Sequence, residues 1–432
     1  MACAPPATQA LFPLDEELGL VPGSLTPHLQ ACLTRLGSWL PFEKAAGMLD
    51  ALLRVEVSEP SARRHTETWG AAQAAVQAEE VAHLERDLPP APPGPEKQLL
   101  SVDGAMVSLV GGEWAEVKTL VLGVIGAPVQ EEGEWVVHTQ DLSYFSRLTD
   151  AQTFGHLALV ETHRRGVETA AEVIAVTDGA EWEQGFIDYH RTDAVRILDF
   201  AHAAERVAEI GAAVWGAQTP TTQTWLKEQL KQLKNEGPGE VLAALRALTQ
   251  AHPLLPELAE HLTYLEKREG HMQYPDYRAA GWPIGSGAVE SGNKVVVETR
   301  LKGAGMHWAR EHVNPMLALR NAVCNDRWDE AWEEMLGYQR QQQEQLKRTR
   351  RERHLAARPV RGADERTAPP DVPTSVVAVS ASAVVESVEV APAPPPEHPH
   401  PRWRPAPDHP WRRSPIGKAR YQPSSPSPSA KK

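Results

Sequence analysis

The stretch LLSVDGAMVSLV, residues 99–110, decides the fold because it sets one aspartate, Asp103, among apolar residues. Its aliphatic composition and the pair of glycines that follows predict a strand that ends in a hairpin. VKTLVLGVI (117–125) and EWVVHTQ (134–140) predict a second and a third strand, joined tightly enough to be antiparallel. A charged side chain inside such an apolar strand is costly unless it is paired or holds a metal ion.

Beyond the third strand, predicted helices and strands alternate along the chain. We expect, in order, a helix over 150–165, a strand over 173–179, a helix over 181–190, a strand over 194–200 and a helix over 202–210. Strands separated by helices are usually parallel to one another. Antiparallel strands followed by parallel ones give the layout of the RNase H fold. The predicted fold class is therefore α/β, with an RNase H-like mixed sheet flanked by helices.

Three carboxylates stand at positions where α/β proteins usually place their sites. Asp103 lies within the first strand, and Asp178 ends the apolar strand VIAVTDG. Glu290 follows the glycine-rich loop GWPIGSG and begins a helix. Asp-Gly is also an ordinary turn dipeptide, and the helix dipole favours a glutamate at a helix start. Because all three carboxylates stand on such strands and on this helix, we expect Asp103, Asp178 and Glu290 to be catalytic.

Carboxylates in this arrangement suit phosphoryl transfer. Such reactions use two divalent ions about 4 Å apart, one at the attacking oxygen and one at the leaving oxygen. Mg²⁺ prefers hard oxygen ligands and keeps several waters, so two or three carboxylates suffice. The expected cofactor is therefore two Mg²⁺ (or Mn²⁺) ions, held by the three carboxylates.

A second aspartate and a histidine follow the next predicted strand. Asp199 ends the stretch ILDF, and His202 comes three residues later. Asp199 competes with Asp178 for the role of second carboxylate, or it supports the site together with His202. The alternative is an aspartate that caps a helix whose first turn contains a histidine.

Basic and polar residues follow Glu290 along its helix. They are Asn293, Lys294, Arg300 and Lys302. A metal-binding carboxylate beside a basic helix face suits a protein that holds a phosphodiester, so we expect these residues to contact DNA. Asn293 is alternatively plain surface.

The N-terminal part predicts helices only. Thr26 caps the first helix, FEKAAGMLDALLR (42–54) forms the second, and Ser58 caps the third. Two helices, a tight turn and a third helix give the outline of a helix-turn-helix module. This reading places Arg63 and Arg64 against bases or phosphates. A helical bundle with solvated arginines fits the same pattern.

Shifts in composition divide the chain into seven segments. Beyond about residue 358, Pro, Ser, Ala and Val dominate, and too few large apolar side chains remain to offset chain entropy. We expect an irregular lead-in (1–25), a helix-turn-helix module (26–87), a Pro-rich linker (88–97), the first part of the RNase H-like core (98–204), an all-helical insertion (205–280), completion of the core with the Glu290 helix (281–353) and a disordered tail (358–432).

Composition also bears on compartment and partners. The 432 residues carry a formal net charge of −13, so contact with DNA needs a local basic face rather than a basic total. The three cysteines lie far apart, which predicts free thiols rather than a disulfide framework. The pattern of a signal peptide is not seen, and the apolar stretches are too short to span a bilayer. We expect a cytoplasmic, nucleoid-associated protein with no membrane partner.

Five stretches resemble the DDE transposases of bacterial insertion sequences. The likeness is to the Kra-type group and, more distantly, to mutator-like elements, and it covers roughly residues 12–340. The stretches are SVDGAMV (101–107), AVTDGAEW (175–182), ILDFAHAAERV (197–207), GWPIGSGAVESGNK (281–294) and TRLKGAGMHWAR (299–310).

The resemblance implies roles for the residues named above. Asp103, Asp178 and Glu290 match the three catalytic carboxylates, while Asp199 and His202 match a D/C-x-x-H motif. The implied activity is binding of terminal inverted repeats, strand cleavage by water, and attack of the freed 3′-OH on target DNA. Pairing two ends of double-stranded DNA implies a homodimer or a larger assembly. Relatives often carry a cysteine-rich segment before the helix-turn-helix; here only the cysteine at position 3 is present, which predicts a shortened or absent segment.

Two other functions fit the same residues. An RNase H-like nuclease that cleaves without joining would use the same carboxylates, but it needs neither the helix-turn-helix nor the helical insertion. A domesticated or decayed DNA-binding protein without catalysis belongs to another class, and the intact carboxylates argue against it. Binding of inverted repeats without Mg²⁺-dependent cleavage would favour that last reading.

Overall fold

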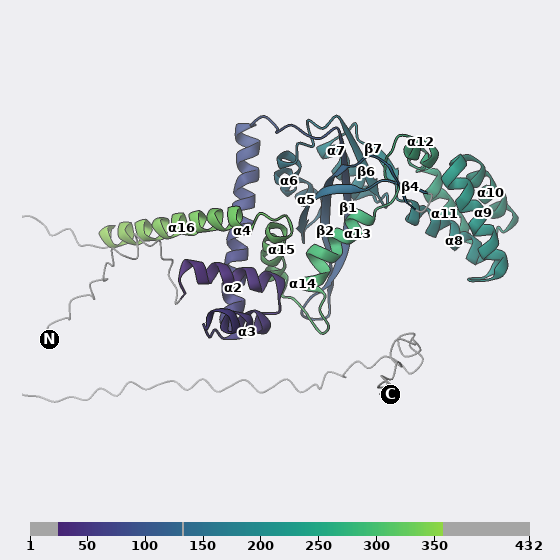
Figure 1. Cartoon of the computed structure of the whole chain (residues 1–432). Coiled ribbons are helices and arrows are strands. Elements are labelled where there is room, and N and C mark those ends of the chain that lie inside the picture. The colour runs from purple at the N-terminus through teal and green to yellow at the C-terminus, as the bar shows by residue number, and fades with distance from the viewer. Residues whose placement is uncertain (1–24, 132–133, 357–432) are drawn as a thin grey trace, which may run out of the picture. The chain divides into compact units, whose positions relative to one another are not determined.

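The computed structural model describes residues 25–131 and 134–356. They form a mixed α/β structure built on a five-stranded sheet (Figure 1), which confirms the α/β part of the predicted fold class. The predicted disordered tail (358–432) lies outside the described residues, as does nearly all of the predicted lead-in (1–25). No helix within the described ranges has an apolar stretch long enough to cross a membrane.

The sheet has the strand order β5-β2-β1-β6-β7, with β1 at its centre. β1 pairs antiparallel with β2, and β2 with β5, whereas β1, β6 and β7 are mutually parallel neighbours. A tight turn joins β1 to β2, and helices separate the later strands, so each pairing direction follows from its connection. The strands are β1 (Lys97–Ser108), β2 (Trp114–Ile125), β5 (Thr139–Arg147), β6 (Glu172–Thr177) and β7 (Val195–Leu198).

Helices precede, connect and follow these strands. Those before or between the strands are α2 (Pro27–Trp39), α3 (Phe42–Leu53), α4 (Glu59–Asp87), α5 (Ala151–Leu157), α6 (Leu159–Arg164) and α7 (Glu181–His190). After β7 come α8 (Phe200–Trp215), α9 (Pro220–Glu236), α10 (Pro238–Ala251), α11 (Pro256–Glu266), the 3-10 helix η1 (Glu269–His271) and α12 (Tyr274–Ala279). The last are α13 (Gly287–Gly292), the π-helix η2 (Asn293–Glu298), α14 (Thr299–Leu301), α15 (Arg310–Cys324) and α16 (Trp328–Ala356).

Side chains of β1 alternate between the two faces of the sheet. Leu100 and Val102 pack in a cluster with residues of α5 and α7. On the opposite face, Leu99 packs with residues of α8 to α12, and Ala105, further along the strand, packs with residues of α13 to α15. Asp103 shares this second face because strand side chains alternate. It therefore lies between two apolar clusters, at the point where the helices that pack on this face change from α8–α12 to α13–α15.

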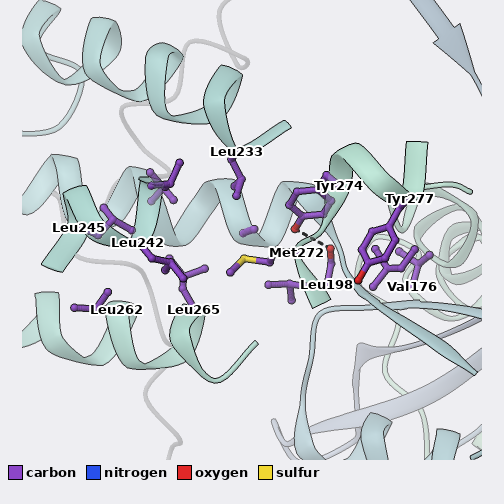
Figure 2. Packing of buried hydrophobic residues seen from close by; sticks show 14 of the residues in the cluster. Val176, Leu198, Leu233, Leu242, Leu245, Leu262, Leu265, Met272, Tyr274 and Tyr277 are labelled. Atoms are coloured by element: carbon purple, nitrogen blue, oxygen red, sulfur yellow. Dashed lines mark hydrogen bonds between the residues drawn. The ribbon is translucent and has the colours of Figure 1, made fainter. Parts of the chain in front are cut away.

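The helical block from α8 to α12 has an apolar core that is continuous with the edge of the sheet. Figure 2 shows Leu233, Leu242 and Leu265 in this core, and each such buried leucine contributes roughly 1.5–3 kcal/mol relative to an exposed one. The buried Tyr274 donates a hydrogen bond of 2.9 Å from its hydroxyl to the carbonyl oxygen of Leu198, at the end of β7 (Figure 2). The block is helical where the sequence predicts an all-helical segment.

The third strand of the sheet is not the predicted one. The sequence predicts a strand over 134–140, but β4 (Glu134–Val136) forms only a small hairpin with β3 (Val129–Glu131). The strand that pairs with β2 is β5, over 139–147. Its sequence, TQDLSYFSR, is rich in polar residues and lacks the β-branched run that marked the other strands. The prediction was wrong because contacts made elsewhere in the chain, rather than local pattern, stabilise β5.

Those contacts come from asparagine side chains along the free edge of β5. Each asparagine accepts a hydrogen bond from a backbone N–H of this segment and donates one to the carbonyl of the same residue, as a neighbouring strand would. The edge is thereby closed to pairing with another chain. The pairs are Asn325 with Tyr144 (2.8 and 2.9 Å), Asn321 with Ser146 (3.1 and 3.4 Å) and Asn314 with Leu148 (2.8 and 3.0 Å).

Three consecutive helices stand ahead of the sheet in the sequence. Thr26 and Ser58 cap α2 and α4 as predicted, each accepting a hydrogen bond from the backbone N–H three residues on. Arg54, with a φ of 56°, ends α3 in the left-handed conformation, and a short turn leads to α4. α4 then packs so closely on α15 that a Cβ at Gly70 would lie 2.4 Å from the carbonyl oxygen of Pro315.

Candidate metal centre

Aspartates stand at the same level on three neighbouring parallel strands. The register of β1 with β6, continued three residues beyond its last pair, sets Asp103 opposite Asp178. The register of β6 with β7, continued by one residue, sets Asp178 opposite Asp199. The parallel arrangement therefore brings together three acidic residues that lie far apart in the sequence. They meet where β6 and β7 end, beside the part of β1 that holds Asp103.

Two of these aspartates form a close group with a glutamate. Asp103, Asp178 and Glu183 each offer a carboxylate oxygen, and the three oxygens lie within 4.8 Å of one another. Mg²⁺ binds oxygen ligands at about 2.0–2.1 Å, so its ligands stand at most about 4 Å apart. Small side-chain movements would thus bring the three oxygens around one ion. The donor set is all hard oxygen, which fits Mg²⁺ or Mn²⁺.

Two nitrogen donors hold the carboxylate of Asp103. Gly104 N donates to Oδ1 at 2.6 Å, and Asn293 Nδ2 donates to Oδ2 at 2.9 Å. Burial raises the pKa of Asp103 above its usual value; the hydrogen bond from Gly104 opposes this rise, and the charge of Asp178 adds to it. Asn293, which we predicted to contact DNA, is instead buried against Asp103, and its Oδ1 has no hydrogen-bond partner among the described residues.

Glu183, in the first turn of α7, was missed by the sequence analysis. It is fully buried, and its Oε2 accepts hydrogen bonds from Gly179 N at 3.0 Å and Ala180 N at 3.1 Å. Within the described structure, its Oε1 is buried without a hydrogen-bond partner. Burial, with a further contribution from Asp178, raises the pKa of Glu183 to about 10. A glutamate in a first helical turn is common, so no local signal marks this residue as buried.

Asp199 connects a histidine to the loop that precedes α13. Its side chain is 1% exposed; Oδ2 accepts a hydrogen bond from His202 Nδ1 at 2.7 Å, and Oδ1 accepts one from Ser286 N at 3.0 Å. Burial favours a higher pKa for Asp199, but the hydrogen bonds from His202 and Ser286 outweigh burial and lower it. The bond to Asp199 raises the pKa of His202. Asp199 also caps α8, as the alternative interpretation of this residue predicts.

Glu290 lies in α13, outside the close carboxylate group. It is exposed, and its Oε1 accepts a hydrogen bond from Ser286 Oγ at 3.2 Å. α13 continues directly into the π-helix η2, whose first residue, Asn293, bonds to Asp103. The helix that carries Glu290 is thus anchored beside the carboxylates at both ends of α13. π-helical segments inside α-helices frequently mark functional sites.

The lysines after Glu290 remain at the surface. Lys294 is exposed. Lys302 is exposed as well, and its Nζ lies 2.7 Å from Glu298 Oε1, four residues earlier. Both ammonium groups are therefore close enough to solvent to meet a charged ligand.

Arg300 has a different environment. It is 2% exposed and donates a hydrogen bond of 3.0 Å to the carbonyl oxygen of Gly37, in α2. Its guanidinium also lies over the rings of Phe42 and Trp308, at 4.7 and 5.0 Å from their centroids. This burial argues against the DNA contact that we predicted for Arg300, because its guanidinium is enclosed by the interior of the protein.

Arg63 and Arg64 lie on the first turns of α4. The side chain of Arg63 is 58% exposed and approaches Glu67 at 4.0 Å. Arg64 is exposed and lines a groove of ≈ 710 Å³ together with polar residues of α16. Both guanidinium groups are thus available to an external ligand.

Comparison with known proteins adds nothing to this geometry. No family model matches the chain, and no curated protein is significantly similar to it. The chemistry of the site is that of a hard-oxygen group able to hold a divalent ion, next to a histidine and a buried amide.

Proposed function

We propose that this chain is a DDE transposase of a bacterial insertion sequence, with an RNase H-like catalytic core. The observation that carries the proposal is the meeting of Asp103 and Asp178 at one edge of the sheet, with their oxygens within 4.8 Å. The mixed strand order supports an RNase H-like core. The sequence motifs that contain Asp103, Asp178 and Glu290 support this class of enzyme.

Asp103, Asp178 and Glu290 would hold the divalent ions, Mg²⁺ or Mn²⁺. Bound ions would supply a Lewis acid for the scissile phosphate and lower the pKa of an attacking water. Asn293 fixes the carboxylate of Asp103, and Ser286 fixes that of Glu290. These hydrogen bonds orient the carboxylates before DNA arrives, so less reorganisation is needed during the reaction.

Asp199 and His202 would support the site. Asp199 holds both the imidazole of His202 and the backbone of Ser286, and through Ser286 it acts on Glu290. His202 lies 2.7 Å from Asp199 through its Nδ1, and the charge of Asp178 adds to the raised pKa of His202.

Handling of DNA would fall to the helical parts. The segment from α2 to α4 would form the helix-turn-helix module, with Arg63 and Arg64 exposed toward DNA, and the block from α8 to α12 would contain the insertion domain. Lys294 and Lys302 would contact phosphates near Glu290. The partners would be the two inverted repeats and the target DNA, and pairing the two ends would require a homodimer or larger assembly. A protein with this substrate would associate with the nucleoid.

The test is cleavage of labelled inverted-repeat DNA with Mg²⁺ or Mn²⁺. We expect metal-dependent nicking at the element end by the wild-type protein. Asp103→Asn, Asp178→Asn and Glu290→Gln should each reduce it by at least about 100-fold, because each removes a ligand that stabilises transition-state charge. Asp188→Asn, which changes an exposed carboxylate of α7, should cleave like the wild type.

The outcomes separate the candidate functions. Nicking without joining of the freed 3′-OH would make the chain a nuclease. Specific binding without nicking, by wild type and variants alike, would leave a DNA-binding protein without catalysis. Wild-type cleavage by any one carboxylate variant would remove that residue from the site.

A further inference from the structure

We propose that Glu183 is a direct ligand of a divalent cation, bound together with Asp103 and Asp178. This inference rests on the proposed function, because it names the residues that would complete one ion site in the same centre. It assigns Glu183 a role that neither its position in the first turn of α7 nor the sequence motifs suggest.

The geometry of the three carboxylates is the first argument. Their oxygens lie within 4.8 Å of one another although they come from β1, the end of β6 and α7. Three ionised carboxylates this close repel one another, so their joint ionisation requires a compensating positive charge. Among the described residues, no arginine, lysine or histidine forms an ion pair with Asp103, Asp178 or Glu183. A bound divalent cation would supply that charge.

Two buried oxygens without partners are the second argument. Glu183 is 0% exposed, and Oε2 alone accepts the two backbone hydrogen bonds at the end of β6, which leaves Oε1 unpaired. Asn293, 5% exposed and bonded to Asp103 through Nδ2, likewise has an unpaired Oδ1. A buried acceptor that is left unsatisfied is costly, so such groups usually have a partner, which can be protein, water or an ion. Oxygen atoms are the ligands that Mg²⁺ prefers.

A purely structural role for Glu183 accounts for only one of its two carboxylate oxygens, Oε2. A helix cap needs one oxygen that accepts backbone N–H groups, and Oε2 fulfils that need. A glutamine would do the same with its amide oxygen. The unpaired and buried Oε1 is explained by a cation and not by the cap.

Direct measurement of Mn²⁺ binding, on the full chain without DNA, tests the proposal. Electron paramagnetic resonance of free Mn²⁺ gives the affinity. We expect Glu183→Gln and Asp103→Asn each to weaken the tightest Mn²⁺ site at least about 10-fold, as loss of a ligand does. Glu181→Gln, two residues earlier on α7 and exposed, should stay within about twofold of wild type. Glu290→Gln should keep one Mn²⁺ at near wild-type affinity, because Glu290 lies outside the group.

Thermal unfolding in EDTA shows whether Glu183→Gln remains folded. A second measurement needs no variant: Fe²⁺ bound in place of Mn²⁺ reduces added hydrogen peroxide to hydroxide and a hydroxyl radical, with ascorbate to restore Fe²⁺, and the radicals cut the backbone next to the ligands of the ion. Cuts near residues 178–184 and near 103 in the wild-type protein support the proposal. Cuts near 103 that spare 178–184, or a Glu183→Gln variant that binds Mn²⁺ like the wild type, overturn it.

The proposal and the transposase function can fail separately. Glu183-dependent Mn²⁺ binding by a protein that does not cleave inverted repeats would retain the ligand and reject the enzyme. Metal-dependent cleavage with unchanged Mn²⁺ affinity in Glu183→Gln would reject the ligand and retain the enzyme.

Discussion

At the end of β7, Asp199 receives hydrogen bonds from His202 and Ser286 while almost fully buried. Burial of a carboxylate is costly unless donors compensate for the lost water. Here the donors belong to two elements, the first turn of α8 and the loop before α13. Ser286 also donates a hydrogen bond to Glu290, the predicted third carboxylate. The position of the Glu290 carboxylate therefore depends on Asp199, at the end of β7.

Asp199→Asn should lower stability in a pH-dependent way. The raised pKa of His202 stabilises the folded protein below pH 6.5, and this contribution disappears as pH rises through the folded-state pKa. The lowered pKa of Asp199 stabilises it above pH 3.8, and this part is lost as pH falls through the folded-state value. The free energy of unfolding that the variant loses is therefore expected to be largest between pH 3.8 and pH 6.5.

Urea unfolding at pH 5.5 and pH 8.5 measures this difference. Glu209→Gln is the matched control, because it removes a carboxylate that is 50% exposed and 3.1 Å from His261, and exposed pairs contribute little. An equal loss at both pH values in Asp199→Asn would contradict the assigned pair.

At the scale of elements, β5 depends on α15 and the turn after it. The asparagine pairs replace the strand that an edge lacks, so a polar sequence becomes part of the sheet. The same kind of contact shapes the helix of Glu290: Arg320 of α15, fully buried, donates to the carbonyl oxygens of Val295 and Val296 inside the π-helix η2. Both elements are thus defined by side chains far away in the sequence.

Asn321→Ala should destabilise the protein by about 1–3 kcal/mol, since it leaves the buried N–H of Ser146 without a partner, while Arg147 still donates to the carbonyl oxygen of Ser146. Urea unfolding gives the free energy, and hydrogen exchange of the segment 139–147 should become faster. Arg310→Ala, exposed on the same helix, is the control and should change stability by no more than about 0.5 kcal/mol. Unchanged exchange in β5 would show that its edge does not need Asn321.

At the scale of the whole molecule, the net charge of −13 disfavours the binding of negatively charged DNA, so the proposed function requires local basic faces. Two sets of exposed cations are available, Arg63 and Arg64 on α4 and Lys294 after Glu290. The structure removes Arg300 from the predicted set, because its guanidinium is buried against α2.

Arg63→Ala combined with Arg64→Ala should weaken binding of inverted-repeat DNA. Each phosphate contact contributes about 0.9 to the slope of log affinity against log salt, so the slope should become shallower by about 1 to 2. Fluorescence anisotropy from 50 to 200 mM salt measures it. Arg86→Ala, exposed at the far end of the same helix, should leave the slope unchanged. A wild-type slope in the double variant would mean that the start of α4 does not face DNA.

The sequence by itself determined the elements whose signals are local. Hydrophobic runs located β1, β2, β6 and β7, and capping residues located the starts of α2 and α4. Strand patterns also singled out Asp103, inside β1, and Asp178, directly after β6, and the register of these parallel strands aligns the two residues.

Only the tertiary structure decided the rest. It made β5 a strand by pairing its edge with asparagines, buried Arg300 and Asn293, and placed Glu183 rather than Glu290 beside the two aspartates. The physical reason is common to these cases. Burial and partner choice depend on residues distant in sequence, so a polar side chain carries no local mark of whether it will meet water, backbone or another carboxylate.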